Sequence, residues 1–85
     1  MVTFQYTVKD ELGLHARPAG ILVKEAKNYA SKIEITSGAK SADATRLLAV
    51  MGMGVKCGDH VTVKVEGTDE AEAATKLEAF FKENL

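Results

Sequence analysis

The chain has 85 residues, of which 46% are hydrophobic and 27% charged, a balance typical of one folded domain over 1–85 and not of a disordered segment. Its formal net charge of −1 argues against general nucleic-acid binding, and no apolar run approaches the roughly 18 residues of a membrane span. The lone cysteine, Cys57, cannot form an internal disulfide, and the first residues lack a signal-peptide pattern, so we expect a cytoplasmic protein.

The first half of the chain predicts a strand, a helix and a hairpin. Residues 2–9 alternate between apolar and polar, as a half-buried strand does, and a polar turn over 10–13 follows. A helix is expected over about 16–28, with Pro18 in its first turn. Strands are expected over 32–37, with Ile33 and Ile35 facing inward, and near 40–43. The apolar stripe of the helix consists of Ala19, Leu22, Val23, Ala26 and Ala30.

The second half predicts a short helix, a strand and a final helix. The short helix spans about 46–52, is capped by Thr45 or Asp43, and ends at the glycines of 52–54. A strand with alternating valines follows the turn at 58–59. Asp69, with Glu72 three residues later, resembles a capping box at the start of a helix that reaches about residue 84. The side chains expected to be buried on this helix are Ala73, Ala74, Leu77, Phe80 and Phe81.

These elements predict an α+β fold. The strands with a clear pattern are apolar on one face only, so a single, mostly antiparallel sheet with all helices on one side is the simplest arrangement.

The segment GLHARPA, residues 13–19, carries the most information about function. His15 directly precedes the predicted helix, whose first N–H groups and partial positive charge bind anions such as phosphate. The same field disfavours a protonated imidazole, so we expect a lowered pKa for His15 and a neutral ring nitrogen that can attack phosphorus. Ala16, Arg17 and Pro18 would form the phosphate cradle, in which Arg17 adds a charged contact. Neither a metal nor another cofactor is required. The residues alone leave open that His15 is only a solvated cap.

The same segment resembles the phosphohistidine motif of the HPr family, the histidine-containing phosphocarriers of the bacterial phosphoenolpyruvate-dependent sugar phosphotransferase system (PTS). The resemblance continues through residues 23–26, 40–42, 51–55 and 67–70. It implies an open-faced β-sandwich with sheet order 1-4-2-3. It also implies that His15 accepts phosphate on Nδ1 from enzyme I and donates it to sugar-specific IIA proteins or domains, including those of membrane-bound permeases. Such a chain is a carrier and not a free-standing enzyme, because His15 is consumed and regenerated.

The resemblance further implies a docking surface on the outer face of the first helix and on the short helix. A small apolar centre with a cationic rim suits transient binding to acidic partners. Leu47, Leu48 and Met51 of the short helix could instead all belong to the core. We expect a split, with at least one of them buried and Leu47 or Met51 exposed. For Lys24 and Lys27, a merely solvated helix face is an equal alternative. The docking residues expected beside Arg17 are Gly20, Ile21, Lys24, Lys27, Arg46, Leu47, Leu48 and Met51.

Arg46 departs from the pattern of many Gram-positive relatives, which carry a kinase-regulated serine at this position. An arginine cannot accept phosphate, and it places a cation near a helix N-terminus at a cost of about 0.3–1 kcal/mol. We hypothesise that Arg46 instead strengthens the basic docking surface.

The other residues with reactive or metal-ligating side chains are expected to have no chemical role. Cys57 is expected to be an idle thiol, His60 a surface residue, and Met51 and Met53 packing or interface residues. We expect a monomer. A second hypothesis is a regulatory module that uses the same surface without carrying sugar-directed flux. A small-ligand-binding module would rest on fold analogy alone.

Overall fold

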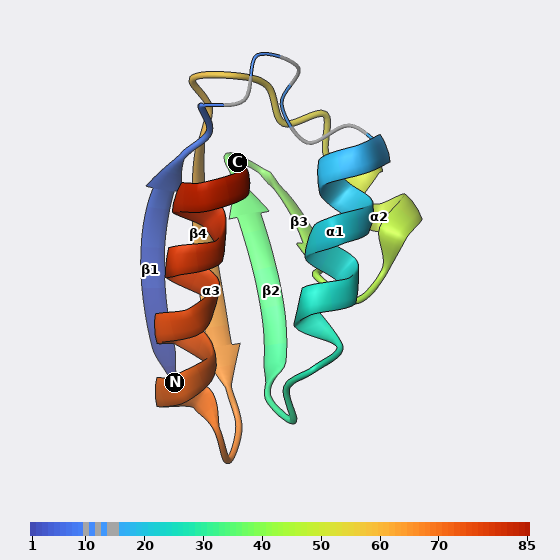
Figure 1. Ribbon diagram of the computed structural model, residues 1–85. Coiled ribbons are helices and arrows are strands. Elements are labelled where there is room, and N and C mark those ends of the chain that lie inside the picture. Colours follow the sequence, from blue (N-terminus) through green and yellow to red (C-terminus); the bar gives the residue numbers. More distant parts are fainter. Residues whose placement is uncertain (10, 12, 14–15) are drawn as a thin grey trace.

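The computed structural model describes residues 1–9, 11, 13 and 16–85 (Figure 1). The predicted element order is confirmed. The elements are β1 (Val2–Thr7), α1 (Ala16–Ala26), β2 (Lys32–Ser37), β3 (Lys40–Asp43), α2 (Leu47–Gly52), β4 (His60–Glu66) and α3 (Glu70–Asn84).

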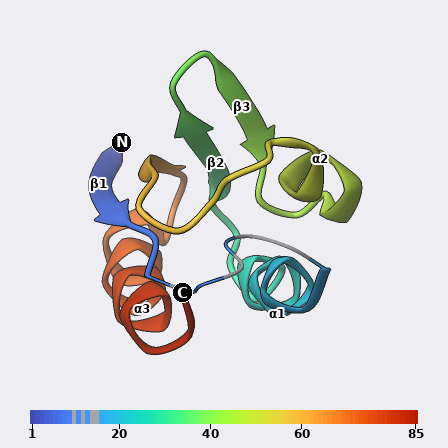
Figure 2. The same cartoon turned by 90° about the horizontal axis from the view of Figure 1, so that it is seen from above.

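The four strands form one antiparallel sheet in the order β1-β4-β2-β3. β4 is central: Val63 pairs with Phe4 of β1 on one side and with Ile35 of β2 on the other. The helices cover one face of the sheet, with α1 and α3 side by side and α2 next to α1 (Figures 1 and 2). This is the open-faced α+β architecture that the sequence and its resemblance predicted.

The core lies between the sheet and the helices. Ile33 and Ile35 are fully buried as predicted, because alternate strand residues point to the covered face. Phe81 of α3 is the largest fully buried side chain and packs edge-on against Phe4 and Tyr6. The apolar stripe of α1 is buried at four of its five predicted positions, which are Ala19, Leu22, Val23 and Ala26.

Two predicted elements end two residues early, and two predicted side-chain positions are wrong. β1 ends at Thr7, although Val8 is still buried. α1 ends at Ala26 and not near residue 28, so Ala30 lies beyond the helix and is exposed. Phe80 is only partly buried, because it lies beside the face of α3 that carries Phe81 into the core. The predicted turn over 10–13 includes residues 10 and 12, which lie outside the described residues.

The start of α2 also differs from the prediction. α2 begins at Leu47, with Arg46 in the N-cap position and without a side-chain capping bond. Asp43 does not cap the helix, because its carboxylate accepts hydrogen bonds from the Thr45 backbone N–H at 2.8 Å and from the Thr45 hydroxyl at 2.6 Å. The two predicted capping residues, Asp43 and Thr45, therefore bond to each other and not to the first N–H groups of α2. These bonds also lower the pKa of Asp43, the bond from the Thr45 hydroxyl most strongly.

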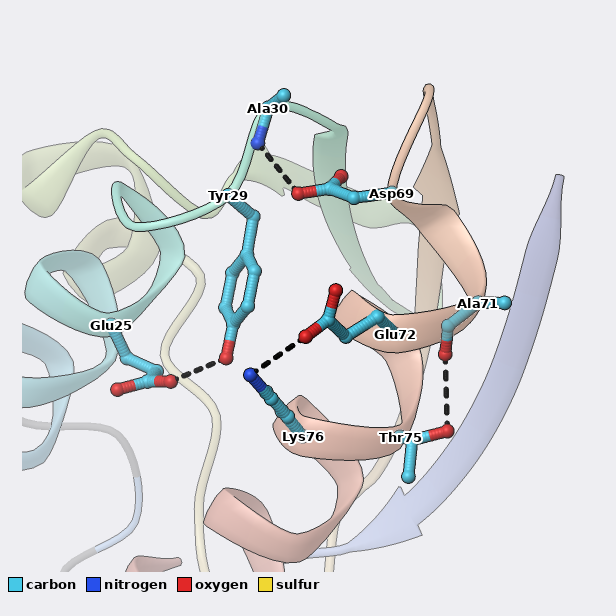
Figure 3. A network of polar contacts seen from close by, with 8 residues as sticks. All are labelled: Glu25, Tyr29, Ala30, Asp69, Ala71, Glu72, Thr75 and Lys76. Carbon is cyan, nitrogen blue, oxygen red and sulfur yellow. Dashed lines mark hydrogen bonds and ion pairs between the residues drawn. The ribbon is translucent and has the colours of Figure 1, made fainter.

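Asp69 occupies the N-cap position of α3, but the predicted capping box is not formed. Its carboxylate accepts a hydrogen bond from the backbone N–H of Ala30 at 2.9 Å (Figure 3). It also accepts bonds from the backbone N–H and the hydroxyl of Ser31. Glu72 forms an ion pair with Lys76 instead, at 2.9 Å. The prediction fails because a tertiary partner competes for the carboxylate.

Candidate functional site

The start of α1 lies where the sequence predicted an anion-binding helix start. α1 begins at Ala16, the residue directly after His15 in the chain. The first N–H groups of a helix have no partner within it and carry partial positive charge, so they can receive phosphoryl oxygens. No acidic side chain lies in the first turn of α1 to oppose an anion. His15 and Leu14 lie outside the described residues.

Arg17 and Pro18 take different positions in this first turn. Arg17 is exposed, and its guanidinium makes no ion pair with any described acidic residue. Pro18 is buried, and its ring fills space at the helix start without removing a needed N–H donor. The sequence therefore folds so that a rigid residue holds the turn against the core and leaves its charged neighbour in solvent.

The outer face of α1 continues this surface. Ile21 is 41% exposed, although it is a large apolar residue, and Gly20 before it is half-buried. Lys24 and Lys27 are exposed. This face is opposite the buried stripe, which contains Leu22, so the same helix presents apolar and cationic groups to solvent.

α2 packs beside α1 and adds a more apolar patch. Leu47 is 41% and Leu48 82% exposed. Met51 is half-buried and packs against the core. The expectation that at least one of these three residues is buried is wrong, whereas the expectation that Leu47 or Met51 is exposed is confirmed by Leu47. Val50, which is fully buried, is the residue by which α2 fills the core.

Arg46 completes the basic rim. It is exposed at the start of α2, next to the exposed apolar pair that follows it. Together the residues on α1 and α2 form a surface of exposed or half-buried apolar side chains, bordered by cations that make no ion pair with any described acidic residue. It is here called the docking surface, after the role that the sequence predicts for it. Its members are Arg17, Gly20, Ile21, Lys24, Lys27, Arg46, Leu47, Leu48 and Met51.

The remaining candidates lie elsewhere. Cys57 is a free, exposed thiol in the turn before β4. His60 is exposed on β4, where its Nδ1 is 2.8 Å from the Thr7 hydroxyl. Met53 is buried and packs in the core. The part of the chain that the structure describes contains no group of three or more His, Cys, Asp and Glu side chains able to hold a metal ion. None of its helices combines the length and apolar character needed to cross a bilayer.

One contact near the site was missed from the sequence. Gly13 is buried against the backbone of Val55 and Lys56, which lie more than forty positions later in the chain. A positive φ of 68° at Gly13 is compatible with the turn predicted there. No periodicity or spacing signals its partner, because the contact depends on how the sheet brings the two loops together.

Comparisons with known proteins agree with this architecture. Residues 2–83 match the family model described as the PTS HPr component phosphorylation site. The phosphocarrier protein HPr of Lysinibacillus sphaericus is 45% identical over 83 residues, which cover 98% of this chain and 94% of that protein.

Solved structures show the same likeness. A crystal structure of HPr from Thermoanaerobacter tengcongensis has a TM-score of 0.93 and 32% identity, covering 99% of this chain and 94% of that one. The Bacillus subtilis catabolite repression protein Crh, solved as a domain-swapped dimer, has a TM-score of 0.77 and 34% identity, covering 100% and 98%. With a full-length family match, this fold and these relatives, the chain belongs to the HPr family of phosphocarrier proteins of the sugar phosphotransferase system.

Proposed function

We propose that His15 is the residue that carries the phosphoryl group, accepting it from enzyme I and donating it to IIA proteins or domains. The observation that carries this proposal is the start of α1 at Ala16, directly after the histidine of the family motif. A phosphoryl group on His15 would gain hydrogen bonds from the first N–H groups of α1 and a charged contact from exposed Arg17.

The chemistry needs only residues of this segment and of the partner proteins. A neutral imidazole nitrogen of His15 attacks the phosphorus carried by enzyme I, forms the N–P bond and displaces the enzyme I group that held it. In the second transfer, the acceptor group of a IIA protein attacks this phosphorus and displaces His15. Each transfer forms one bond to phosphorus and breaks one, so His15 is restored and no cofactor is consumed.

We propose that the docking surface receives both enzyme I and IIA partners. Its exposed apolar centre, which includes Ile21 and Leu48, can be desolvated on contact, while the surrounding cations attract acidic partners and accelerate encounter. Enzyme I and IIA would therefore bind in turn and not together. Arg46 adds a cation to this surface where a regulatory serine would otherwise stand.

We also propose that the protein acts in the cytoplasm as a monomer. β1 pairs along its length with β4 of its own chain, so one chain can form the four-stranded sheet without a partner. The Crh dimer described as domain-swapped makes an exchanged dimer the competing possibility. Light scattering during size-exclusion chromatography distinguishes them: a mass of one chain supports the proposal, and a stable mass of two contradicts it.

The experiment that tests the proposed carrier role uses purified enzyme I, magnesium and phosphoenolpyruvate. We expect intact-protein mass spectrometry to show the gain of one phosphoryl group that is labile in acid and stable in base, as a phosphohistidine is. Adding a IIA protein should remove the group. No adduct, with the same enzyme I active on another carrier, would contradict the proposal.

A further inference from the structure

The turn that leads from α2 to β4 lies against the segment that leads to His15. The Gly58 N–H donates a hydrogen bond to the Val8 carbonyl at 2.8 Å, and the Val8 N–H donates to the Asp59 carbonyl at 3.0 Å. Figure 1 shows the end of β1 and the connection from α2 to β4 at the same end of the sheet. The backbone at Val8, five residues before the motif that begins at Gly13, is therefore joined to residues 58–59.

Asp59 closes this turn from both sides. Its carboxylate Oδ2 accepts a hydrogen bond from the Lys56 N–H at 2.9 Å, and its own N–H donates to the Lys56 carbonyl at 3.0 Å. Val55, at the beginning of the turn, is buried. The turn is thus held at one end by the core, and at the other by the exposed Asp59 side chain together with the backbone bonds to Val8.

Gly13 is the residue that contacts this turn. A Cβ atom at Gly13 would lie 2.2 Å from the Val55 carbonyl oxygen and 2.7 Å from the Lys56 Cα. Both distances are far inside van der Waals contact and involve backbone atoms, so any larger residue must move one of the two loops. Gly38 has a similar φ of 60° but no atom within 4 Å of such a Cβ. Gly13 therefore serves a close approach as well as a left-handed backbone conformation.

We propose that Gly13 and Asp59 are positioning residues for phosphoryl transfer. Gly13 packs against the 55–59 turn, whose shape Asp59 maintains. This contact determines where the chain lies two residues before His15. This inference rests on the proposed role of His15. Because in-line transfer depends on the placement of the attacking nitrogen, a displacement of about 1 Å can reduce the rate by about a hundredfold. The docking surface is on α1 and α2 and does not include Gly13 or Asp59. Substitutions at these two residues should therefore lower kcat and leave KM unchanged.

Four variants test the proposal with enzyme I and phosphoenolpyruvate. Gly13→Ala pushes the two loops apart, whereas Gly38→Ala imposes a similar backbone strain in open space and is its matched control. Asp59→Ala removes the acceptor of the Lys56 N–H, and Asp59→Asn keeps an acceptor oxygen there. We expect kcat to fall by about tenfold or more in Gly13→Ala and Asp59→Ala, with KM for this protein within about twofold of wild type. Gly38→Ala and Asp59→Asn should stay close to wild type in both constants.

Three kinetic results would overturn the proposal: a kcat for Gly13→Ala no lower than for Gly38→Ala, a loss confined to KM, or a loss in Asp59→Ala that Asp59→Asn does not restore. If Gly13→Ala does not fold, the comparison of Asp59→Ala with Asp59→Asn tests the proposal by itself. The His15 imidazole resonances of the unphosphorylated protein give a readout that does not need transfer. They should shift in Asp59→Ala and return in Asp59→Asn, and unchanged resonances contradict the proposal. A wild-type protein that accepts no phosphoryl group would instead contradict the role of His15.

Discussion

Asp69, at the start of α3, accepts hydrogen bonds from both the backbone N–H and the hydroxyl of Ser31. Ser31 is the last residue of the loop before β2, and the two residues are 38 positions apart in the chain. Gly67 packs against the same serine, since a Cβ at Gly67 would lie 2.6 Å from the Ser31 Cα. The bonds therefore join the loop after α1 to the loop after β4 at one end of the sheet (Figure 1).

This relationship predicts an acid-sensitive contribution to stability. The hydrogen bond from the Ser31 hydroxyl, supported by the N–H groups of Ala30 and Ser31, lowers the pKa of Asp69 below its ordinary value of 3.8. A carboxylate whose pKa is lower in the folded state stabilises the fold above the unfolded pKa, and this contribution disappears as the pH falls from about 3.8 toward the lower folded value. Asp69→Asn should therefore lower the melting temperature at pH 7 and reduce its decline with acid. Glu83→Gln, which removes an exposed charge, is the control, and equal pH profiles for the two variants would contradict the account.

The environment of Tyr6 indicates that its replacement by phenylalanine stabilises the protein. Its ring is buried against Phe81, and its hydroxyl has no hydrogen-bond partner among the described residues. Tyr6→Phe removes this unsatisfied hydroxyl and should raise the free energy of unfolding by about 1 kcal/mol in urea denaturation. Tyr29→Phe is the opposite case, because the Tyr29 hydroxyl donates to Glu25 at 2.6 Å (Figure 3). It should lower stability by about 1 kcal/mol. A loss of stability in Tyr6→Phe would show that its hydroxyl is satisfied.

The two sides of α2 should separate docking from folding. Leu48 is 82% exposed and Val50 fully buried. Leu48→Ala should raise the KM for phosphorylation by enzyme I by about threefold or more with little change in stability, because its apolar surface is desolvated only on binding. Val50→Ala leaves a cavity and should lower the free energy of unfolding by about 2 kcal/mol. An unchanged KM in Leu48→Ala would contradict the proposal that α2 is part of the docking surface.

Arg46 should contribute to encounter with partners through its charge. Arg46→Ser should slow transfer from enzyme I by about threefold at low salt, and the difference should shrink as ionic strength screens the charge. Lys64→Ser, on the uncovered face of the sheet, removes the same charge away from the docking surface and should have little effect. An unchanged rate and salt dependence in Arg46→Ser would exclude the docking role of Arg46.

The fold could be predicted well because its patterns are local. Alternating residues around Ile35 and Val63 defined strands, and the stripe through Leu22 defined a helix with one buried face. The strand order was implied by the family resemblance and not by the patterns themselves. The errors at Asp43 and Asp69 share one cause: short polar side chains choose among several nearby donors, and their choice is decided by neighbours that periodicity does not reveal.

The candidate site was predictable to a different extent. The motif around His15 and the start of α1 could be read from adjacent residues, as could the exposed face with Lys24. The contact of Gly13 with Val55 could not, because loop packing across the end of a sheet leaves no mark in local sequence. The exposure of Leu48 was equally hidden, since a six-residue helix contains too few positions to show which face is buried.

The most direct test of the account compares the two histidines of the chain as phosphoryl acceptors. His15→Ala and His60→Ala are each incubated with enzyme I, magnesium and phosphoenolpyruvate, with folding checked by circular dichroism. The account predicts that His15→Ala folds and gains no phosphoryl group, whereas His60→Ala is phosphorylated at the wild-type rate. A folded His15→Ala protein that still gains an acid-labile phosphoryl group would contradict it.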